Sequence, residues 1–292
     1  MRIYTLEDKE LEIRKVAVIG AGAMGSGIAY ICAMKGHEVA ITDVNEELLK
    51  RGVSRIRQMI VDGVSRGKLQ PKDAEEVMRK VKGTTSIVEA ARDADLIVEA
   101  IYEDLNAKKE VFKKLDENCP AHAILASNTS ALSISEMGKA TQRPDKVIGV
   151  HFFNPPYAMK LVEIVMGDQT GEDTRKTTDD FVKGLGKETV TVKDSPGFIV
   201  NRLVLPMLNE AAYLVYEGKA TIEDVDKAVT LGMNFPAGPF RLADFVGLDV
   251  ALAVLEHLYE AFGEKFKPCP ILVEKVRNRQ LGIKTRKGFY EY

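Results

Sequence analysis

The segment Val16-Ala-Val-Ile-Gly20-Ala-Gly22-Ala23-Met24-Gly25 decides the fold of this chain. A short apolar run is followed at once by three glycines with the spacing G-x-G-x-x-G. No charged residue occurs between Val16 and Lys35. This pattern predicts a buried strand, a tight turn and a helix. The glycines would let the backbone approach a pyrophosphate, which would bind to the unpaired amides at the helix N-terminus. The segment therefore predicts a dinucleotide-binding fold.

Asp43 supports this interpretation and indicates which dinucleotide binds. It ends the next apolar run, eighteen positions after Gly25. A carboxylate at that place accepts hydrogen bonds from the adenosine ribose and repels a 2'-phosphate, and Val44 and Asn45 follow it rather than an arginine. The sequence predicts NAD rather than NADP as the cofactor. The predicted contacts are Gly20, Gly22, Ala23, Met24, Gly25 and Asp43.

The organisation of the chain predicts two domains, since 292 residues are many for one core. Strand and helix patterns alternate up to Asp194-Ser-Pro-Gly197, after which period-two alternation nearly disappears. We expect the α/β class, with a Rossmann-type doubly wound sheet domain over residues 1–192 and an all-α C-terminal domain over residues 193–292. The expected strands cover residues 16–20, 38–43, 84–86, 96–101, 123–127, 147–152, 161–165 and 189–192. The expected helices cover residues 22–35, 46–82, 106–117, 173–185, 198–217, 222–231, 249–262 and 271–281.

Composition narrows the possible partners. Lys and Arg number 41 against 43 Asp and Glu, and this formal charge of -2 gives no sign of attraction to nucleic acid or membranes. The three cysteines form no CxxC pair, which favours a reducing compartment. Cys119 and His122 have CxxH spacing without a second pair, so no metal site is expected. The first fifteen residues lack an apolar signal region, and the sequence predicts a cytoplasmic protein.

A second motif, His151-Phe-Phe-Asn-Pro155, carries chemistry. The histidine ends one apolar run, and Glu163 stands twelve positions later inside the next run. An imidazole oriented by a carboxylate can accept the proton of an alcohol while its carbon loses hydride. The other three histidines, His37, His122 and His257, stand in no such motif. Together with a site for NAD, the pair predicts an alcohol dehydrogenase.

Several motifs taken together resemble the short-chain L-3-hydroxyacyl-CoA dehydrogenase family, particularly its bacterial and archaeal 3-hydroxybutyryl-CoA dehydrogenases. The resemblance begins at Arg14 and runs to the last residue. The motifs that carry it are residues 20–25, 98–101 with Glu103, 127–130, 151–155, 194–202, 238–239 and 287–290.

The resemblance implies NAD-dependent interconversion of L-3-hydroxyacyl-CoA and 3-ketoacyl-CoA, an activity of fatty acid metabolism. It makes His151 the catalytic base and Glu163 its partner, and it places Ser130 and Asn201 at the reacting end of the substrate. It further implies that Glu103, Lys108 and Asn128 lie around the nicotinamide half of the cofactor or its ribose. An acyl-CoA partner and a homodimer formed through the helical domain follow from the same resemblance.

The acyl-CoA contacts have a weaker sequence signal. The segment after Asp43 shows no clear counterpart of the family's CoA-contacting serine. Between Lys50 and Lys68, however, six basic residues stand against one acid, Asp62. These basic residues, with Arg55 and Arg57 as candidates, would bind the phosphates of coenzyme A. The alternative is an ordinary solvated helix face.

Three alternatives to this function stay open. A gulonate-type dehydrogenase would share most of the motifs and act on a sugar acid. A hydroxyisobutyrate-type enzyme would carry a lysine four positions before Asn201, where this chain has Gly197. A non-catalytic NAD-binding protein would have no need of Ser130, His151 and Glu163 together.

Overall fold

The computed structural model describes residues 11–292. The chain divides into two compact units, of which the first ends at Asp194 and the second spans Ser195–Tyr292. Among the described residues, none of the helices is both long and apolar enough to span a membrane.

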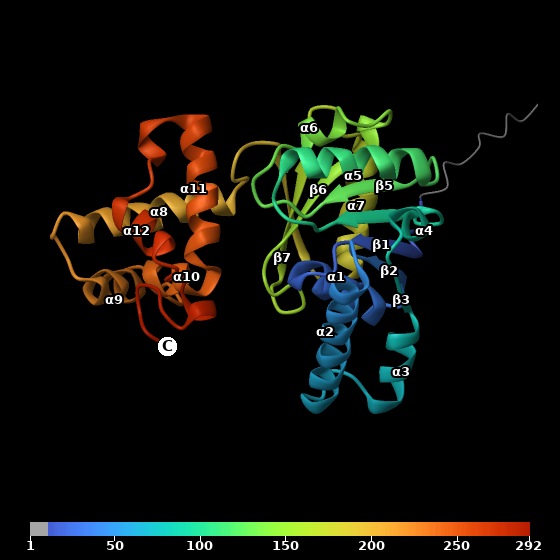
Figure 1. The fold of residues 1–292 in the computed structure, drawn as a ribbon, viewed down its shortest axis with the longest axis horizontal. Helices are drawn as coiled ribbons and strands as arrows, with labels where there is room; N and C mark the ends of the chain where they lie inside the picture. Colours follow the sequence, from blue (N-terminus) through green and yellow to red (C-terminus); the bar gives the residue numbers. More distant parts are fainter. Residues whose placement is uncertain (1–10) are drawn as a thin grey trace, which may run out of the picture. The chain divides into compact units, whose positions relative to one another are not determined.

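The first unit is built on one eight-stranded sheet (Figure 1). Its strand order is β3-β2-β1-β4-β5-β6-β7-β8, and all neighbours are parallel except β6 and β7. The strands are β1 (Lys15–Ile19), β2 (Glu38–Thr42), β3 (Val81–Thr84), β4 (Leu96–Glu99), β5 (Ile124–Ser127), β6 (Val147–Phe152), β7 (Leu161–Met166) and β8 (Glu188–Lys193). The sheet confirms the predicted Rossmann-type α/β fold.

The strand order positions the site. The chain builds β1, β2 and β3 in one direction and then returns to place β4 on the other side of β1. Ligands of such sheets bind at the carboxyl ends of the strands, where the order reverses. Every residue of β4, β5 and β6 is buried. These central strands therefore read as continuous apolar runs, with polar residues mainly at their ends.

Seven helices accompany the sheet in the described part of this unit, and the two short ones at residues 87–91 and 134–138 were not predicted from the sequence. The helices are α1 (Ala23–Met34), α2 (Glu46–Ser65), α3 (Pro71–Arg79), α4 (Ile87–Ala91), α5 (Leu105–Asn118), α6 (Ile134–Gly138) and α7 (Glu172–Gly184). The single helix predicted over residues 46–82 is wrong, because Gly67 adopts a left-handed φ of 68° and Pro71 begins a new helix. α2 and α3 then extend side by side (Figure 1). The strand predicted at 84–86 also begins earlier, at Val81.

The second unit is helical, as the sequence predicted. It comprises α8 (Val200–Tyr216), α9 (Ile222–Gly232), α10 (Pro239–Val246), α11 (Leu248–Phe262) and α12 (Pro270–Arg277). The predicted cap of α9 is present, since the Thr221 side chain accepts a hydrogen bond of 3.1 Å from the Asp224 amide. α10 was not predicted, because eight residues between two glycines give too short a periodic signal.

Candidate active site

His151 and Glu163 face each other across a hairpin. Only residues 153–160 connect β6 to β7, too few for a crossover, so the two strands pair antiparallel. Their register sets His151 directly opposite Glu163, which places both side chains on the same face of the sheet. His151 Nδ1 lies 2.7 Å from Glu163 Oε2. The twelve-residue spacing seen in the sequence is therefore the span of this hairpin.

His151 and Glu163 are both buried, so they interact with each other rather than with water. The exposed fractions of His151 and Glu163 are 4% and 0%, so the carboxylate has little water to bind. An ionised Glu163 accepts the Nδ1–H bond, and the neutral imidazole then presents Nε2 as its proton acceptor. The Phe153 ring packs against the imidazole with a centroid distance of 4.5 Å. Such an arrangement can serve as a general base held in one orientation.

The glycine loop after β1 has the close approaches that the motif predicts. Gly20 has a φ of +106°, and a Cβ there would lie 2.5 Å from the Ala100 carbonyl oxygen. A Cβ at Gly25 would lie 1.8 Å from the Gly20 carbonyl oxygen. No side chain caps the N-terminus of α1, whose N-cap is Gly22. The start of this helix thus suits a pyrophosphate, since anions bind the amides at helix N-termini.

Asp43 braces the same loop. Its Oδ2 accepts a hydrogen bond of 2.8 Å from the Ala21 amide, and its Oδ1 accepts one of 2.8 Å from the Val44 amide. Each carboxylate oxygen can accept a further bond. Asp43 can therefore hold the loop and bind a ribose hydroxyl at the same time.

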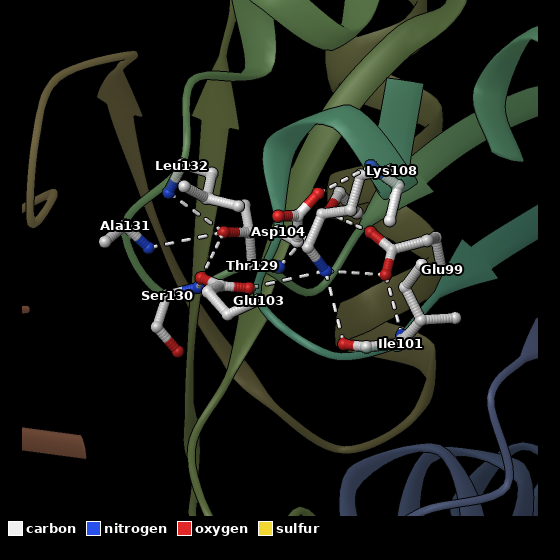
Figure 2. Close-up of polar contacts among 11 residues, drawn as sticks. Glu99, Ile101, Glu103, Asp104, Lys108, Thr129, Ser130, Ala131 and Leu132 are labelled. Atoms are coloured by element: carbon white, nitrogen blue, oxygen red, sulfur yellow. Dashed lines mark hydrogen bonds and ion pairs between the residues drawn. The ribbon is translucent and has the colours of Figure 1, made fainter. Parts of the chain in front are cut away.

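A charged network joins the ends of β4 and β5 (Figure 2). Glu99, the last residue of β4, is fully buried and accepts hydrogen bonds from Lys108 Nζ at 2.6 Å and from the Ser127 hydroxyl at 2.6 Å. It also accepts one of 2.7 Å from the Ile101 amide. Lys108 Nζ lies 3.3 Å from Glu103 Oε2, and only 1% of the lysine is exposed. The buried ammonium thus stands between two carboxylates.

Glu103 and Asn128 extend this network to the loop after β5 and to β6. Glu103 Oε1 accepts hydrogen bonds from the Thr129 hydroxyl at 2.5 Å and from the Ser130 amide at 2.8 Å. Figure 2 shows Glu103 between Lys108 and the backbone of Ser130. Asn128 Oδ1 accepts a bond of 3.0 Å from the Phe152 amide, directly after His151. The structure therefore links Glu103, Lys108, Asn128 and Ser130 at the carboxyl ends of the central strands.

The remaining predicted residues lie elsewhere. Asn201 stands in the first turn of α8, in the second unit. In α2, Arg55 Nη1 donates a 3.0 Å hydrogen bond to the Ala21 carbonyl and lines a surface hollow, whereas Arg57 is exposed outside it. The hollow is lined by Glu47, Lys50, Arg51, Ser54, Arg55 and Gln58. Within residues 11–292, no group of three or more His, Cys, Asp or Glu side chains is placed to hold a metal.

The positive excess along α2 is smaller than the sequence suggested. Lys50 pairs with Glu46 at 3.0 Å, and Arg51 pairs with Glu47 at 2.5 Å. Both acids precede the basic segment that was counted in the sequence, one helical turn before their partners.

Two residues that hold the site in place, Glu99 and Lys187, were not predicted from the sequence. Glu99 had a signal, because it is a charge ending the otherwise apolar run Leu96-Ile-Val. Lys187 had none. It donates hydrogen bonds to the carbonyls of Pro156 at 2.6 Å and Met159 at 2.7 Å, so it holds the loop that connects His151 to Glu163. Burial lowers the pKa of Lys187 below that of an exposed lysine.

Comparisons with known proteins match both units of the chain. The family model for the 3-hydroxyacyl-CoA dehydrogenase NAD binding domain matches residues 15–195, and the model for the C-terminal domain of that family matches residues 197–292. A probable 3-hydroxybutyryl-CoA dehydrogenase of Bacillus subtilis is 44% identical over 97% of this chain and 98% of its own length. The 3-hydroxybutyryl-CoA dehydrogenase of Clostridioides difficile is 45% identical over 95% of this chain and 99% of its own. A crystal structure of (S)-3-hydroxybutyryl-CoA dehydrogenase from Ralstonia eutropha superposes with a TM-score of 0.91 at 40% identity, covering 96% of this chain and 99% of that one.

Proposed function

The chain belongs to the 3-hydroxyacyl-CoA dehydrogenase family, and on that premise we propose how its residues carry out the reaction. It is an NAD-dependent oxidoreductase that interconverts a 3-hydroxyacyl-CoA and the corresponding 3-ketoacyl-CoA. The proposed substrate is L-3-hydroxybutyryl-CoA, because the relatives that match nearly the whole chain carry that name. The single observation that carries the proposed mechanism is the buried contact of 2.7 Å between His151 and Glu163.

In the proposed oxidation, His151 Nε2 accepts the proton of the substrate hydroxyl. As the O–H bond breaks, the C–H bond at the same carbon breaks and its electron pair leaves as hydride, so that a carbonyl forms. Glu163 stabilises the resulting imidazolium through its bond to Nδ1. In the reverse direction the imidazolium returns its proton to the carbonyl oxygen.

The substrate oxygen gains negative charge as its proton leaves. We propose that Ser130 and Asn201 donate hydrogen bonds to this oxygen. For Ser130 the support is its position, since Glu103 fixes its amide at 2.8 Å in the loop that follows β5. For Asn201 the support is its place within residues 197–292, which match the model for the C-terminal domain of the family.

The cofactor fits the first unit. When bound, NAD accepts the hydride. The residues proposed to hold its adenosine and pyrophosphate are Asp43 and the loop of Gly20, Gly22, Ala23, Met24 and Gly25, where extra side-chain atoms at Gly20 or Gly25 would collide with backbone. Glu103 and Asn128 are proposed at the nicotinamide half, and Lys108 is proposed to act there through the carboxylates that it holds.

The preference for NAD is expected to depend on Asp43. Replacing Asp43 with serine and Val44 with arginine removes the carboxylate and supplies a cation for a 2'-phosphate. We expect the wild type to have a higher kcat/KM with NADH than with NADPH, and the double variant to show near-equal values or the reverse order. Steady-state kinetics with both cofactors measures this. A wild type that prefers NADPH would contradict the role given to Asp43.

Arg55 is expected to contribute to acyl-CoA binding. Because it lines the hollow on α2, Arg55→Ala should raise KM for acetoacetyl-CoA by roughly 3- to 10-fold, the effect of a partly exposed charge-assisted bond. A short thioester without the nucleotide should be nearly indifferent to the change. The KM for NADH is measured in parallel, since Arg55 also contacts the Ala21 carbonyl.

Two further variants separate a phosphate site from an ordinary solvated helix. Arg57→Ala tests the second candidate, which lies outside the hollow, and Lys113→Ala, an exposed cation in α5, is the matched control outside the basic segment. Equal effects of Arg55→Ala on both thioesters, or none on either, would place the coenzyme A phosphates elsewhere.

We also propose a homodimer and a cytoplasmic location. Large apolar side chains stand exposed on the second unit, among them Leu203, Leu231 and Phe245 at 68%, 75% and 56%. Exposed apolar surface of this kind supports association with a second copy through the helical unit. The cytoplasmic location is supported by the three cysteines, all of which are free thiols.

The oxidation assay separates this function from the gulonate-type alternative and from the non-catalytic alternative. L-3-hydroxybutyryl-CoA and L-gulonate are each offered with NAD, and NADH formation is followed. Turnover confined to the thioester supports the proposal, turnover of gulonate alone favours the sugar-acid alternative, and none with either favours a non-catalytic protein.

A further inference from the structure

The network at the ends of β4 and β5 carries an unbalanced charge. Lys108 Nζ lies 2.6 Å from Glu99 and 3.3 Å from Glu103. Among residues 11–292 it is the one cation that pairs with either carboxylate. One ammonium between two carboxylates leaves a net charge of -1 on the three side chains.

Two of the three side chains in the network, Glu99 and Lys108, are shielded from water. Glu99 and Lys108 are 0% and 1% exposed, while the side chain of Glu103 is 41% exposed. A charge buried in protein is screened far less than one at the surface, so its field reaches a neighbouring ligand. The buried pair therefore determines how much of the negative charge of Glu103 remains uncompensated.

The position of the network relates this charge to the cofactor. Asp43 and the glycine loop lie at the ends of β2 and β1, on the adenosine side of the point where the strand order reverses. A dinucleotide that crosses this point extends its nicotinamide half over the ends of β4 and β5. There Glu103 holds the amide of Ser130, beside the strand that carries His151.

We propose that Glu99, Lys108 and Glu103 act together as a selector of the cofactor's oxidation state, with Glu99 as the positioning residue that sets the net charge. The nicotinamide ring carries a positive charge in NAD⁺ and none in NADH, so a net negative network favours NAD⁺. The inference rests on the proposed placement of the nicotinamide half. It goes beyond that placement in assigning a role to Glu99, which is too deeply buried to contact the cofactor itself.

Hydrogen bonding alone does not explain why a carboxylate occupies position 99. A glutamine has the same shape, and its carbonyl oxygen can accept the bonds from Lys108 and the Ile101 amide. Its amide can donate to the Ser127 hydroxyl oxygen. What glutamine lacks is the charge.

The test compares two variants by equilibrium titration of the purified protein with NAD⁺, NADH and ADP-ribose. Glu99→Gln brings the network to a net charge of zero. We expect Kd for NAD⁺ to rise roughly three- to tenfold relative to Kd for NADH, from one unit charge acting across several ångströms of protein. A tenfold rise in the ratio of Kd for NAD⁺ to Kd for NADH raises the reduction potential of the bound two-electron couple by about 30 mV.

The second variant separates charge from geometry. Glu99→Gln combined with Lys108→Met restores a net charge of -1, carried by Glu103, although two side chains now differ from the wild type. The ratio of Kd for NAD⁺ to Kd for NADH should return toward the wild-type value. A purely structural role for Glu99 predicts the opposite, because the double variant loses more contacts than the single one.

ADP-ribose lacks the nicotinamide ring and shows whether each variant keeps a folded adenosine site. If Glu99→Gln weakens NAD⁺ and NADH by the same factor while ADP-ribose binds normally, the selector is overturned and the nicotinamide placement stands. If none of the three Kd values changes, the network lies away from the cofactor, and both the selector and that placement are wrong.

Discussion

Replacing His151 with glutamine is expected to lower kcat for both directions of the reaction by roughly 10²-fold or more, the contribution of a positioned general base. The glutamine amide can still bond to Glu163, but it cannot take up the substrate proton that Nε2 accepts. Because His151 is 4% exposed and lies on β6, away from the glycine loop, Kd for NADH should stay near that of the wild type. Steady-state kinetics and NADH titration measure the two quantities separately.

The matched control is His122→Gln. This histidine is half exposed and pairs with Asp95 at 3.0 Å, so its loss should leave kcat unchanged. Turnover retained in His151→Gln would remove the residue from the mechanism. A large loss of NADH binding would show instead that the substitution disturbs the sheet.

Glu163→Gln should lower kcat by roughly 10- to 100-fold, since the imidazolium loses its carboxylate and the imidazole its fixed tautomer. The neutral amide can donate a hydrogen bond to Nδ1, which forces the imidazole proton onto Nε2, the atom that must accept the substrate proton. The KM for acetoacetyl-CoA should change little, because Glu163 is fully buried behind His151. Kinetics in both directions would show the same proportional loss.

Glu188→Gln serves as the control for this variant. Glu188 begins β8, the strand next to β7, and is exposed. A wild-type rate in Glu163→Gln would leave the carboxylate with a packing role only.

The parts of the fold that the sequence could predict depend on local chemistry. The glycine loop is one, because only glycine fits where a Cβ at position 25 would come within 1.8 Å of the Gly20 oxygen. The pairing of His151 with Glu163 is another. A hairpin that joins two apolar strands through eight residues leaves few registers, and the observed one puts the two side chains opposite each other.

What the sequence could not predict depends on weak local signals or on contacts that only the fold creates. Residues 46–82 form two helices because Gly67 ends the first and Pro71 begins the second. Both residues are weak signals inside a long amphipathic pattern. Lys187 looks like any surface lysine until the fold brings it to the carbonyls of Pro156 and Met159. Lys108 was predicted near the cofactor, but its ion pair with Glu99 was not, because only the fold brings the start of α5 to the end of β4.

One measurement tests the central claim, that the buried His151–Glu163 pair serves NAD-dependent chemistry on an acyl-CoA. NADH consumption is followed with acetoacetyl-CoA, free acetoacetate and a sugar-acid ketone, for the wild type and for His151→Gln. We predict that the wild type turns over acetoacetyl-CoA far faster than the other two substrates, and that this activity falls by roughly 10²-fold or more in the variant. Equal or greater activity with a substrate lacking coenzyme A, or an unimpaired variant, would contradict the account.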